Sequence, residues 1–167
     1  MQVLDIGCGP GFITLGLAEA VVPGEVVGID MQQSQVQRAR DLATEHGVAN
    51  VHFEVGDAYG LPFPDHSFDA VFAHAVLLHL REPVRALAEM RRVLRKGGIA
   101  GVREADHGTM LFAPATPLLD EWLALMNRKL LHLGGNPFEG RRLRRLLMDA
   151  GFARAEMTSS THTAGSH

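Results

Sequence analysis

The sequence predicts an α/β domain with an open, mostly parallel sheet and helices on both faces. Short apolar runs alternate with helical patterns through the first half of the chain, and the first run is too hydrophobic to have a solvent face. A glycine-rich turn follows that run directly. The 167 residues suffice for one core without disulfides or a structural metal. We therefore expect a single domain over residues 1–158 and a disordered, small and polar tail over residues 159–167.

The expected elements follow from local changes in pattern. The second helix shows apolar spacing on one face and ends before a C-cap glycine, and a first-turn proline opens the third. Helices are expected at residues 11–22, 34–46, 83 to the Gly97-Gly98 pair, 118–133, and in a short stretch ending at residue 150. Strands are expected at residues 3–6, 26–29, 51–55, 68–73 and 99–103. The sheet has six strands if residues 152–158 form another, and five otherwise.

Composition excludes several classes of function. A net charge of −3 provides no overall cationic field that would steer the chain toward nucleic acid or anionic lipid. Cys8 is the single cysteine, which excludes an intrachain disulfide and a cysteine-built zinc site and suits a reducing compartment. No stretch approaches the ~20 apolar residues that span a bilayer. We expect a cytoplasmic protein with no membrane span and no nucleic-acid partner.

The strongest motif is VLDIGCGPG at residues 3–11, a strand that leads into a glycine turn and a helix. Ligands of open parallel sheets bind at the carboxyl ends of strands, and glycine lets a ligand approach the backbone. The spacing is G-x-G-x-G, one residue shorter than the G-x-G-x-x-G of nicotinamide sites. Asp5 beside the turn would repel pyrophosphate and can orient an ammonium. The motif therefore favours a ligand with an ammonium and a sulfonium over a dinucleotide.

Two further acids close the next two strands. Asp30 ends the second strand, where a carboxylate can accept hydrogen bonds from both ribose hydroxyls, as it also does in NAD sites. Met31 can pack on a purine face. Gly56-Asp57-Ala58 ends the third strand, and the Asp57 carboxylate either accepts a hydrogen bond from an adenine amino group or caps a turn.

These strand ends resemble the class I S-adenosylmethionine-dependent methyltransferases, whose fold is Rossmann-like. Two later segments resemble the subgroup that includes ubiquinone and menaquinone biosynthesis methyltransferases. They are LPFPDHSFD at residues 61–69 and RRVLRKGG at residues 91–98, with Lys96 where the subgroup usually has proline. The resemblance implies transfer of the methyl group of S-adenosylmethionine to a small-molecule O, N or C acceptor by in-line displacement, with S-adenosylhomocysteine as product.

The resemblance also implies roles for individual residues. The methionine part of the cofactor would be surrounded by Asp5, Gly7, Gly9 and Gly11. The ribose would be held by Asp30, with an added contact from Gln35, and the adenine by Gly56, Asp57 and Ala58 beside Met31. The sulfonium would face Ala73 and His74 at the end of the fourth strand.

Candidates for catalysis are fewer, because the sulfonium already activates the methyl group. His74, His79 and His107 are candidate bases, since imidazole titrates near the working pH. No carboxylate ends the fourth strand, so we expect no metal. Residues 73–76 read AHAV, unlike the motif of methyltransferases that act on DNA bases. The helix with Trp122, Leu125, Met126 and Leu130 is expected to cover the acceptor pocket, to pack in the core, or both.

The chain departs from the family at both ends. The glycine motif begins at residue 3, without the helix that usually precedes it, and the antiparallel seventh strand is expected to be missing. An edge of the fifth strand would then be unpaired. Either the sequence is part of a longer enzyme, or a homodimer or a rearrangement completes the fold. A cofactor-binding remnant or subunit without turnover is the alternative to an active enzyme, and a nicotinamide-dependent oxidoreductase is a more distant one.

Overall fold

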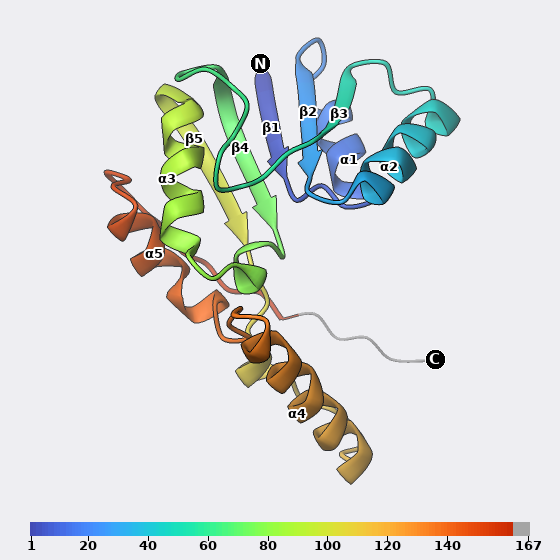
Figure 1. Cartoon of the computed structure of the whole chain (residues 1–167), viewed down its shortest axis with the longest axis vertical. Helices are drawn as coiled ribbons and strands as arrows, with labels where there is room; N and C mark the ends of the chain where they lie inside the picture. The colour runs from blue at the N-terminus through green and yellow to red at the C-terminus, as the bar shows by residue number, and fades with distance from the viewer. Residues whose placement is uncertain (162–167) are drawn as a thin grey trace.

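A computed structural model describes residues 1–161 and has a parallel sheet at its centre (Figure 1). Its strands are β1 (Gln2–Ile6), β2 (Glu25–Asp30), β3 (Val51–Val55), β4 (Phe68–His74) and β5 (Leu94–Arg103). They lie in the order β3-β2-β1-β4-β5, and every neighbouring pair is parallel. Four of the five residues of β1 are buried, as a central strand covered on both faces requires. The Rossmann-like fold expected from the sequence is confirmed.

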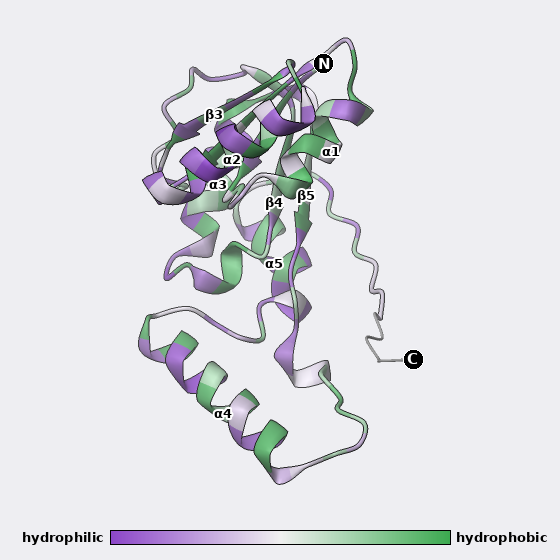
Figure 2. Cartoon of the chain, turned by 90° about the vertical axis from the view of Figure 1, so that its right-hand side faces the viewer, coloured by the Kyte–Doolittle hydropathy of each residue, from purple (hydrophilic) through white to green (hydrophobic). Residues whose placement is uncertain are grey.

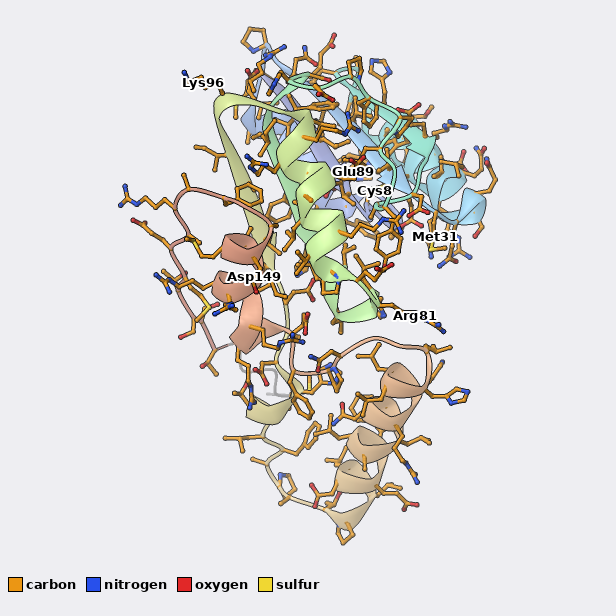
Figure 3. All side chains as sticks on the ribbon, turned by 60° about the vertical axis from the view of Figure 1, so that its left-hand side comes forward. Cys8, Met31, Arg81, Glu89, Lys96 and Asp149 are labelled. Carbon is orange, nitrogen blue, oxygen red and sulfur yellow. The ribbon has the colours of Figure 1, made fainter. Side chains whose placement is uncertain are left out.

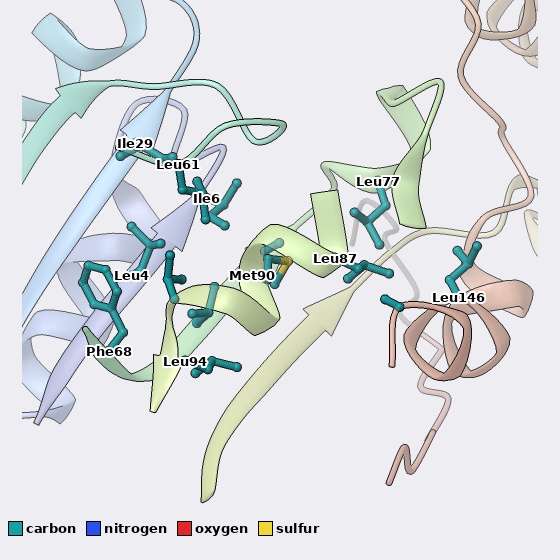
Figure 4. Packing of buried hydrophobic residues seen from close by; sticks show 14 of the residues in the cluster. Leu4, Ile6, Ile29, Leu61, Phe68, Leu77, Leu87, Met90, Leu94 and Leu146 are labelled. Atoms are coloured by element: carbon teal, nitrogen blue, oxygen red, sulfur yellow. The ribbon is translucent and has the colours of Figure 1, made fainter. Parts of the chain in front are cut away.

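Helices cover both faces of the sheet (Figure 1). One face carries α1 (Phe12–Ala20) and α2 (Gln33–His46), and the other carries α3 (Pro83–Val93) and α5 (Leu143–Asp149). The core under α1 and α2 includes Val3, Leu15, Val26, Val36, Ala39 and Phe53. The core under α3 and α5 includes Leu4, Phe68, Leu77, Leu87, Met90 and Leu146 (Figure 4). Both faces of the sheet are therefore buried by apolar contacts.

The order of the strands reverses beside β1. The chain runs outward from β1 through β2 to β3 and then returns to the other side of β1 as β4. In open α/β sheets, ligands bind outside the carboxyl ends of the strands at this kind of reversal. The turns that follow β1, β2 and β4 therefore meet at one edge of the sheet.

The third helix is shorter than expected from the sequence. It ends at Val93, whereas the helical pattern and the Gly97-Gly98 pair predict an end four residues later. Leu94 already pairs with Phe68 of β4, and the register between β4 and β5 then shifts. Gly97 has a φ of +82° within this irregular part of β5. Pairing within the sheet overrides the local helical preference of these residues.

Residues 152–158 do not form the possible sixth strand, so the sheet in the described part of the chain has five strands. Residues 152–161 are irregular and pair with no strand. The carbonyl of Ala155 accepts a hydrogen bond from Nε of Arg144 in α5 (3.3 Å), so a side chain uses a group that a strand would give to its neighbour. Within residues 1–161 the outer edge of β5 therefore has no strand beside it. Of the tail expected to be disordered, residues 162–167 lie outside the described residues.

Helix α4 (Pro117–His132) lies apart from the sheet, below the carboxyl ends of the strands (Figures 1 and 2). Among its residues only Leu130 is buried, while Trp122 and Leu125 are 49% and 56% exposed. The ring of Trp122 meets that of Phe112 edge to face. Packing in the core, one of the two roles expected for this helix, therefore applies to Leu130 alone. Covering the acceptor stays a prediction.

Three short 3-10 helices complete the described chain: η1 (Leu77–His79) after β4, η2 (His107–Thr109) after β5, and η3 (Gly140–Arg142) before α5. No helix within residues 1–161 is long and apolar enough to cross a membrane.

Candidate functional site

The glycine turn after β1 depends on left-handed backbone. Gly7, Gly9 and Gly11 have φ values of +69°, +53° and +91°, which side chains disfavour. A Cβ added at Gly7 would lie 2.5 Å from Cγ2 of Val76, in the turn after β4. A Cβ added at Gly9 would meet no atom within 4 Å. Gly7 is therefore needed for packing, whereas Gly9 faces open space at the edge where a ligand can approach.

Alanine at these two glycines should have different effects. Gly7→Ala should lower the free energy of unfolding by roughly 2–4 kcal/mol, because strain at positive φ adds to the clash with Val76. Gly9→Ala should lower it by only about 1–2 kcal/mol from the backbone alone, and should weaken cofactor binding at least ~10-fold by filling the open space. Urea unfolding and calorimetric titration measure the two effects. Unchanged cofactor affinity in Gly9→Ala would show that the cofactor does not approach this turn.

Asp30 joins the end of β2 to the glycine turn. Its Oδ2 accepts a hydrogen bond from the amide of Gly9 (3.0 Å), and its Oδ1 accepts one from the amide of Gln32 (2.9 Å). Its backbone carbonyl accepts a third from the amide of Gly56, just after β3 (3.1 Å). The ends of β1, β2 and β3 are thus linked through this residue. Met31, next to it, is 77% exposed (Figure 3).

Asp5 lies beneath the turn and is almost fully buried, with 2% of its surface exposed. Oγ1 of Thr14 in α1 donates a hydrogen bond of 2.6 Å to its Oδ2. Burial raises the pKa of Asp5 to about 6, and the Thr14 hydrogen bond opposes this rise only in part. A cationic partner would therefore compensate for the cost of burying this charge.

The remaining residues expected at the adenosyl end differ in their surroundings. Asp57 is exposed and caps a turn, because its Oδ1 accepts a hydrogen bond from the amide of Tyr59 (2.9 Å). Ala58 is partly buried against the core under α3. Gln35, in the first turn of α2, has a buried Oε1 that no group in the described residues satisfies. This unpaired oxygen suits a contact with a ribose hydroxyl.

The turn after β4 is held by a carboxylate from the end of β5. Oε1 of Glu104 accepts hydrogen bonds from the amides of Val76 (2.8 Å) and Leu77 (2.6 Å). Burial raises the pKa of Glu104 to about 7, and the charge of Glu139 adds to the rise. Glu139 is itself 1% exposed and is paired with Arg142 at 2.9 Å. One partly buried acid, Glu104, and one buried acid, Glu139, therefore lie behind this turn.

Ala73 and His74, the last two residues of β4, have different surroundings. The side chain of Ala73 is fully buried in the core, so only its backbone is available to a cofactor. His74 is partly exposed, and burial together with the charge of Arg103 lowers its pKa. His74 is therefore mostly neutral at pH 7.

The other two candidate histidines come from the turns after β4 and β5. Burial, followed by the charge of His107, lowers the pKa of His79. Nδ1 of His107 lies 2.6 Å from Oδ1 of Asn127 in α4. The structure thus brings His79 and His107 close enough for their charges to interact, while His74 belongs to β4 itself.

The thiol of Cys8, the absence of a cluster of metal ligands in the described residues, and the cavities nearby also bear on what this edge of the sheet can bind. Cys8, inside the glycine turn, is buried, and burial with the charges of Asp5 and Asp30 raises the pKa of its thiol to about 12. Within residues 1–161 no three His, Cys, Asp or Glu side chains gather as metal ligands would. A cavity of about 590 Å³ lies between α2 and β3 and another of about 230 Å³ beside β5. Neither cavity is lined by residues of the glycine turn.

A parallel sheet whose central strand ends in a glycine turn, with a carboxylate of the next strand bonded to that turn, defines an α/β protein that binds a nucleoside cofactor. The model of the methyltransferase domain family matches residues 1–151. An uncharacterized methyltransferase of Schizosaccharomyces pombe is 38% identical over 168 residues, covering 97% of this chain and 60% of the relative. The demethylmenaquinone methyltransferase of a Geobacillus strain is 32% identical over 173 residues, covering 96% and 74%.

A solved structure agrees with these relatives. The crystal structure of the YcgJ protein of Bacillus subtilis is 35% identical, with a TM-score of 0.61, covering 76% of this chain and 51% of that one. The chain belongs to the methyltransferase domain family and has the fold of the class I S-adenosylmethionine-dependent enzymes. The resemblance and the cofactor expected from the sequence are confirmed. The chain spans 60%, 43% and 55% of the length of three curated relatives that it matches.

Four residues of the site were missed at the level of sequence. Thr14 follows the turn on the buried side of α1, so its helical spacing with Ala18 was an available signal. Glu104 directly follows the fifth strand, and that position was the available signal for it. Glu139 and Asn127 lie near the candidate site because of contacts between distant segments, and no local sequence pattern predicts this.

Proposed function

We propose that this chain transfers the methyl group of S-adenosylmethionine to a small-molecule acceptor. The observation that carries the proposal is the link between Asp30 and the amide of Gly9, at a turn with open space in front of it. Asp5 would hold the ammonium of the cofactor, Asp30 and Gln35 its ribose, and the Asp57 turn its adenine. The bound cofactor would supply an activated methyl group on sulfur.

The protein's part in such a reaction is chiefly to position the reactants. Holding the acceptor atom in line with the breaking bond, near contact distance, can contribute several kcal/mol to lowering the barrier. The turn held by Glu104 and the backbone at Ala73 would form the wall beside the reacting atoms. Helix α4 would lie over the acceptor.

The acceptor is a small molecule with an oxygen, nitrogen or carbon nucleophile. Relatives of this chain carry the names demethylmenaquinone methyltransferase, sterol 24-C-methyltransferase and O-methyltransferase, which support small organic acceptors of more than one atom type. The net charge of −3 favours a small molecule over nucleic acid. A cytoplasmic location stays a prediction, which fractionation of cells would test.

Calorimetric titration with S-adenosylmethionine, S-adenosylhomocysteine and NADH tests the cofactor. We expect binding of the first two and none of NADH. Asp30→Ala should abolish detectable binding, because it removes the carboxylate that serves both ribose and turn, while the exposed control Asp41→Ala on α2 should bind as the wild type does. Binding of NADH without S-adenosylmethionine would overturn the proposal.

Release of S-adenosylhomocysteine in the presence of an acceptor panel of phenols, hydroquinones, sterols and amines tests turnover. Acceptor-dependent release supports the enzyme. Tight binding of S-adenosylmethionine with no release for any acceptor favours the alternative, a cofactor-binding remnant or a subunit without turnover.

We further propose that a second copy of the chain covers the outer edge of β5. Ile99 on this strand is 68% exposed, and unpaired strand edges favour association. Light scattering after size-exclusion chromatography should give twice the monomer mass, and Ile99→Lys should shift the protein toward the monomer. A monomeric wild type at micromolar concentration would contradict this.

A further inference from the structure

Helix α4 contacts the turn after β5 through one well-defined polar bond. Nδ1 of His107 lies 2.6 Å from Oδ1 of Asn127, a short hydrogen bond. An amide oxygen has lone pairs and no proton, so the imidazole must donate. The proton of a neutral His107 is therefore on Nδ1, and Nε2 keeps its lone pair.

The backbone around His107 is held from two sides. The amide of His107 donates to the carbonyl of Pro137 (2.9 Å), and the amide of Asn136 donates to the carbonyl of Leu78 (2.8 Å). The segment between α4 and α5 thus ties the turn of His107 to the turn of His79. The imidazole of His107 is fixed relative to the end of β4, where the methyl group would be presented.

The charged groups around this imidazole are largely compensated. The neighbouring Asp106 accepts two hydrogen bonds from the guanidinium of Arg141, at 2.5 and 2.7 Å. Glu104 is engaged with backbone amides, and Glu139 is paired with Arg142. His79 is close enough for its charge to interact with that of His107, and burial together with that charge lowers the pKa of His79. Within the described residues no carboxylate is hydrogen-bonded to His107 itself.

We propose that His107 is the general base of the transfer, that Asn127 is its positioning residue, and that the acceptor is therefore a hydroxyl or an amine. This inference rests on the function proposed above. As the acceptor oxygen or nitrogen bonds to the methyl carbon, the carbon–sulfur bond breaks and its electron pair stays on sulfur. The acceptor's proton passes to Nε2 of His107, and the partly exposed imidazolium later returns it to water.

Nuclear magnetic resonance on the ¹⁵N-labelled full chain tests the geometry without turnover. Long-range ¹H–¹⁵N correlations should show His107 protonated on Nδ1. Asn127→Ala should abolish that preference, and Asn127→Asp should raise the pKa of His107 by roughly 1–3 units, because a carboxylate favours the imidazolium. A wild-type His107 protonated on Nε2, or one that Asn127→Ala leaves unchanged, would overturn the proposal.

Turnover with phenol, hydroquinone and primary amine acceptors tests the base. His107→Gln should lower kcat roughly 10²- to 10⁴-fold with unchanged affinity for S-adenosylmethionine, and Asn127→Ala should lower kcat less and shift the pH profile. His132→Gln, an exposed histidine on the same helix α4, is the matched control and should keep wild-type kcat.

The failures of the two proposals are distinguishable. If the wild type does not bind S-adenosylmethionine, the proposed function fails. If it binds and methylates an acceptor while His107→Gln keeps full kcat, or if it methylates carbon alone, only the present inference is overturned. If no acceptor in the panel reacts, the protonation of His107 and its response to Asn127→Ala still decide the geometry.

Discussion

Asp5→Asn should stabilise the protein without cofactor and almost abolish cofactor binding. The pKa of Asp5 is raised to about 6 by burial, so its charge at pH 7 costs folding free energy that a neutral amide does not. The difference from the ordinary pKa of 3.8 corresponds to at most about 3 kcal/mol of added stability. The asparagine can still accept the Thr14 hydrogen bond. It cannot pair with an ammonium, so affinity for S-adenosylmethionine should fall ~10²-fold or more.

Asp5 makes both the free energy of unfolding and the affinity for S-adenosylmethionine depend on pH. Because the folded pKa lies above the unfolded one, the contribution of Asp5 to stability is complete below pH 3.8 and is lost as pH rises to about 6. If the ionised carboxylate holds the ammonium as proposed, the affinity for S-adenosylmethionine should fall up to ~10-fold per pH unit below about pH 6. Thermal melts with and without S-adenosylmethionine between pH 4 and pH 8 measure this. A cofactor-induced shift that does not change with pH in the wild type would contradict the role of Asp5.

Glu104→Ala should be among the most destabilising single substitutions in the chain. It leaves the amides of Val76 and Leu77 without their acceptor in a partly buried turn, at a cost of roughly 2–5 kcal/mol. Glu104→Gln is the matched control, because its side-chain oxygen can accept the same two bonds without a charge. Below about pH 4.5, where Glu104 is protonated in both the folded and the unfolded chain, the free energy of unfolding of Glu104→Gln should stay within about 1 kcal/mol of the wild type.

Urea unfolding at several pH values separates the bonds of Glu104 from its charge. The pKa of Glu104 is raised from 4.5 to about 7, so its contribution to stability declines between these values as pH rises, and this decline should vanish in Glu104→Gln. Equal stability of the alanine and glutamine variants would show that the two bonds do not hold the turn.

Local sequence patterns were sufficient to predict β1 and the glycine turn after it, at the centre of the fold. β1 could be recognised because a strand buried on both faces must be apolar throughout, and the turn after it because only glycine tolerates its φ values. Asp30 was identified at the site because parallel strands bring their carboxyl ends to one edge. Its bond to Gly9 agrees with that expectation.

The outer parts were harder to predict because contacts between distant segments decide them. Leu94 joins the sheet by pairing with Phe68, which the helical pattern of residues 83–98 does not reveal. Residues 152–158 have enough apolar character for a strand, but the carbonyl of Ala155 bonds to a side chain. The spacing in α4 predicts a helix and says nothing of its distance from the sheet. Asn127 meets His107 only because of where α4 lies.

The buried thiol of Cys8 gives this protein a built-in chemical reporter. The sequence has a single cysteine, and it sits inside the turn that the cofactor would contact. With a thiol pKa of about 12, alkylating reagents can react with it only when the turn opens. The alkylation rate thus measures how often the turn between β1 and α1 opens, and a ligand that closes the turn slows that rate without any engineered label.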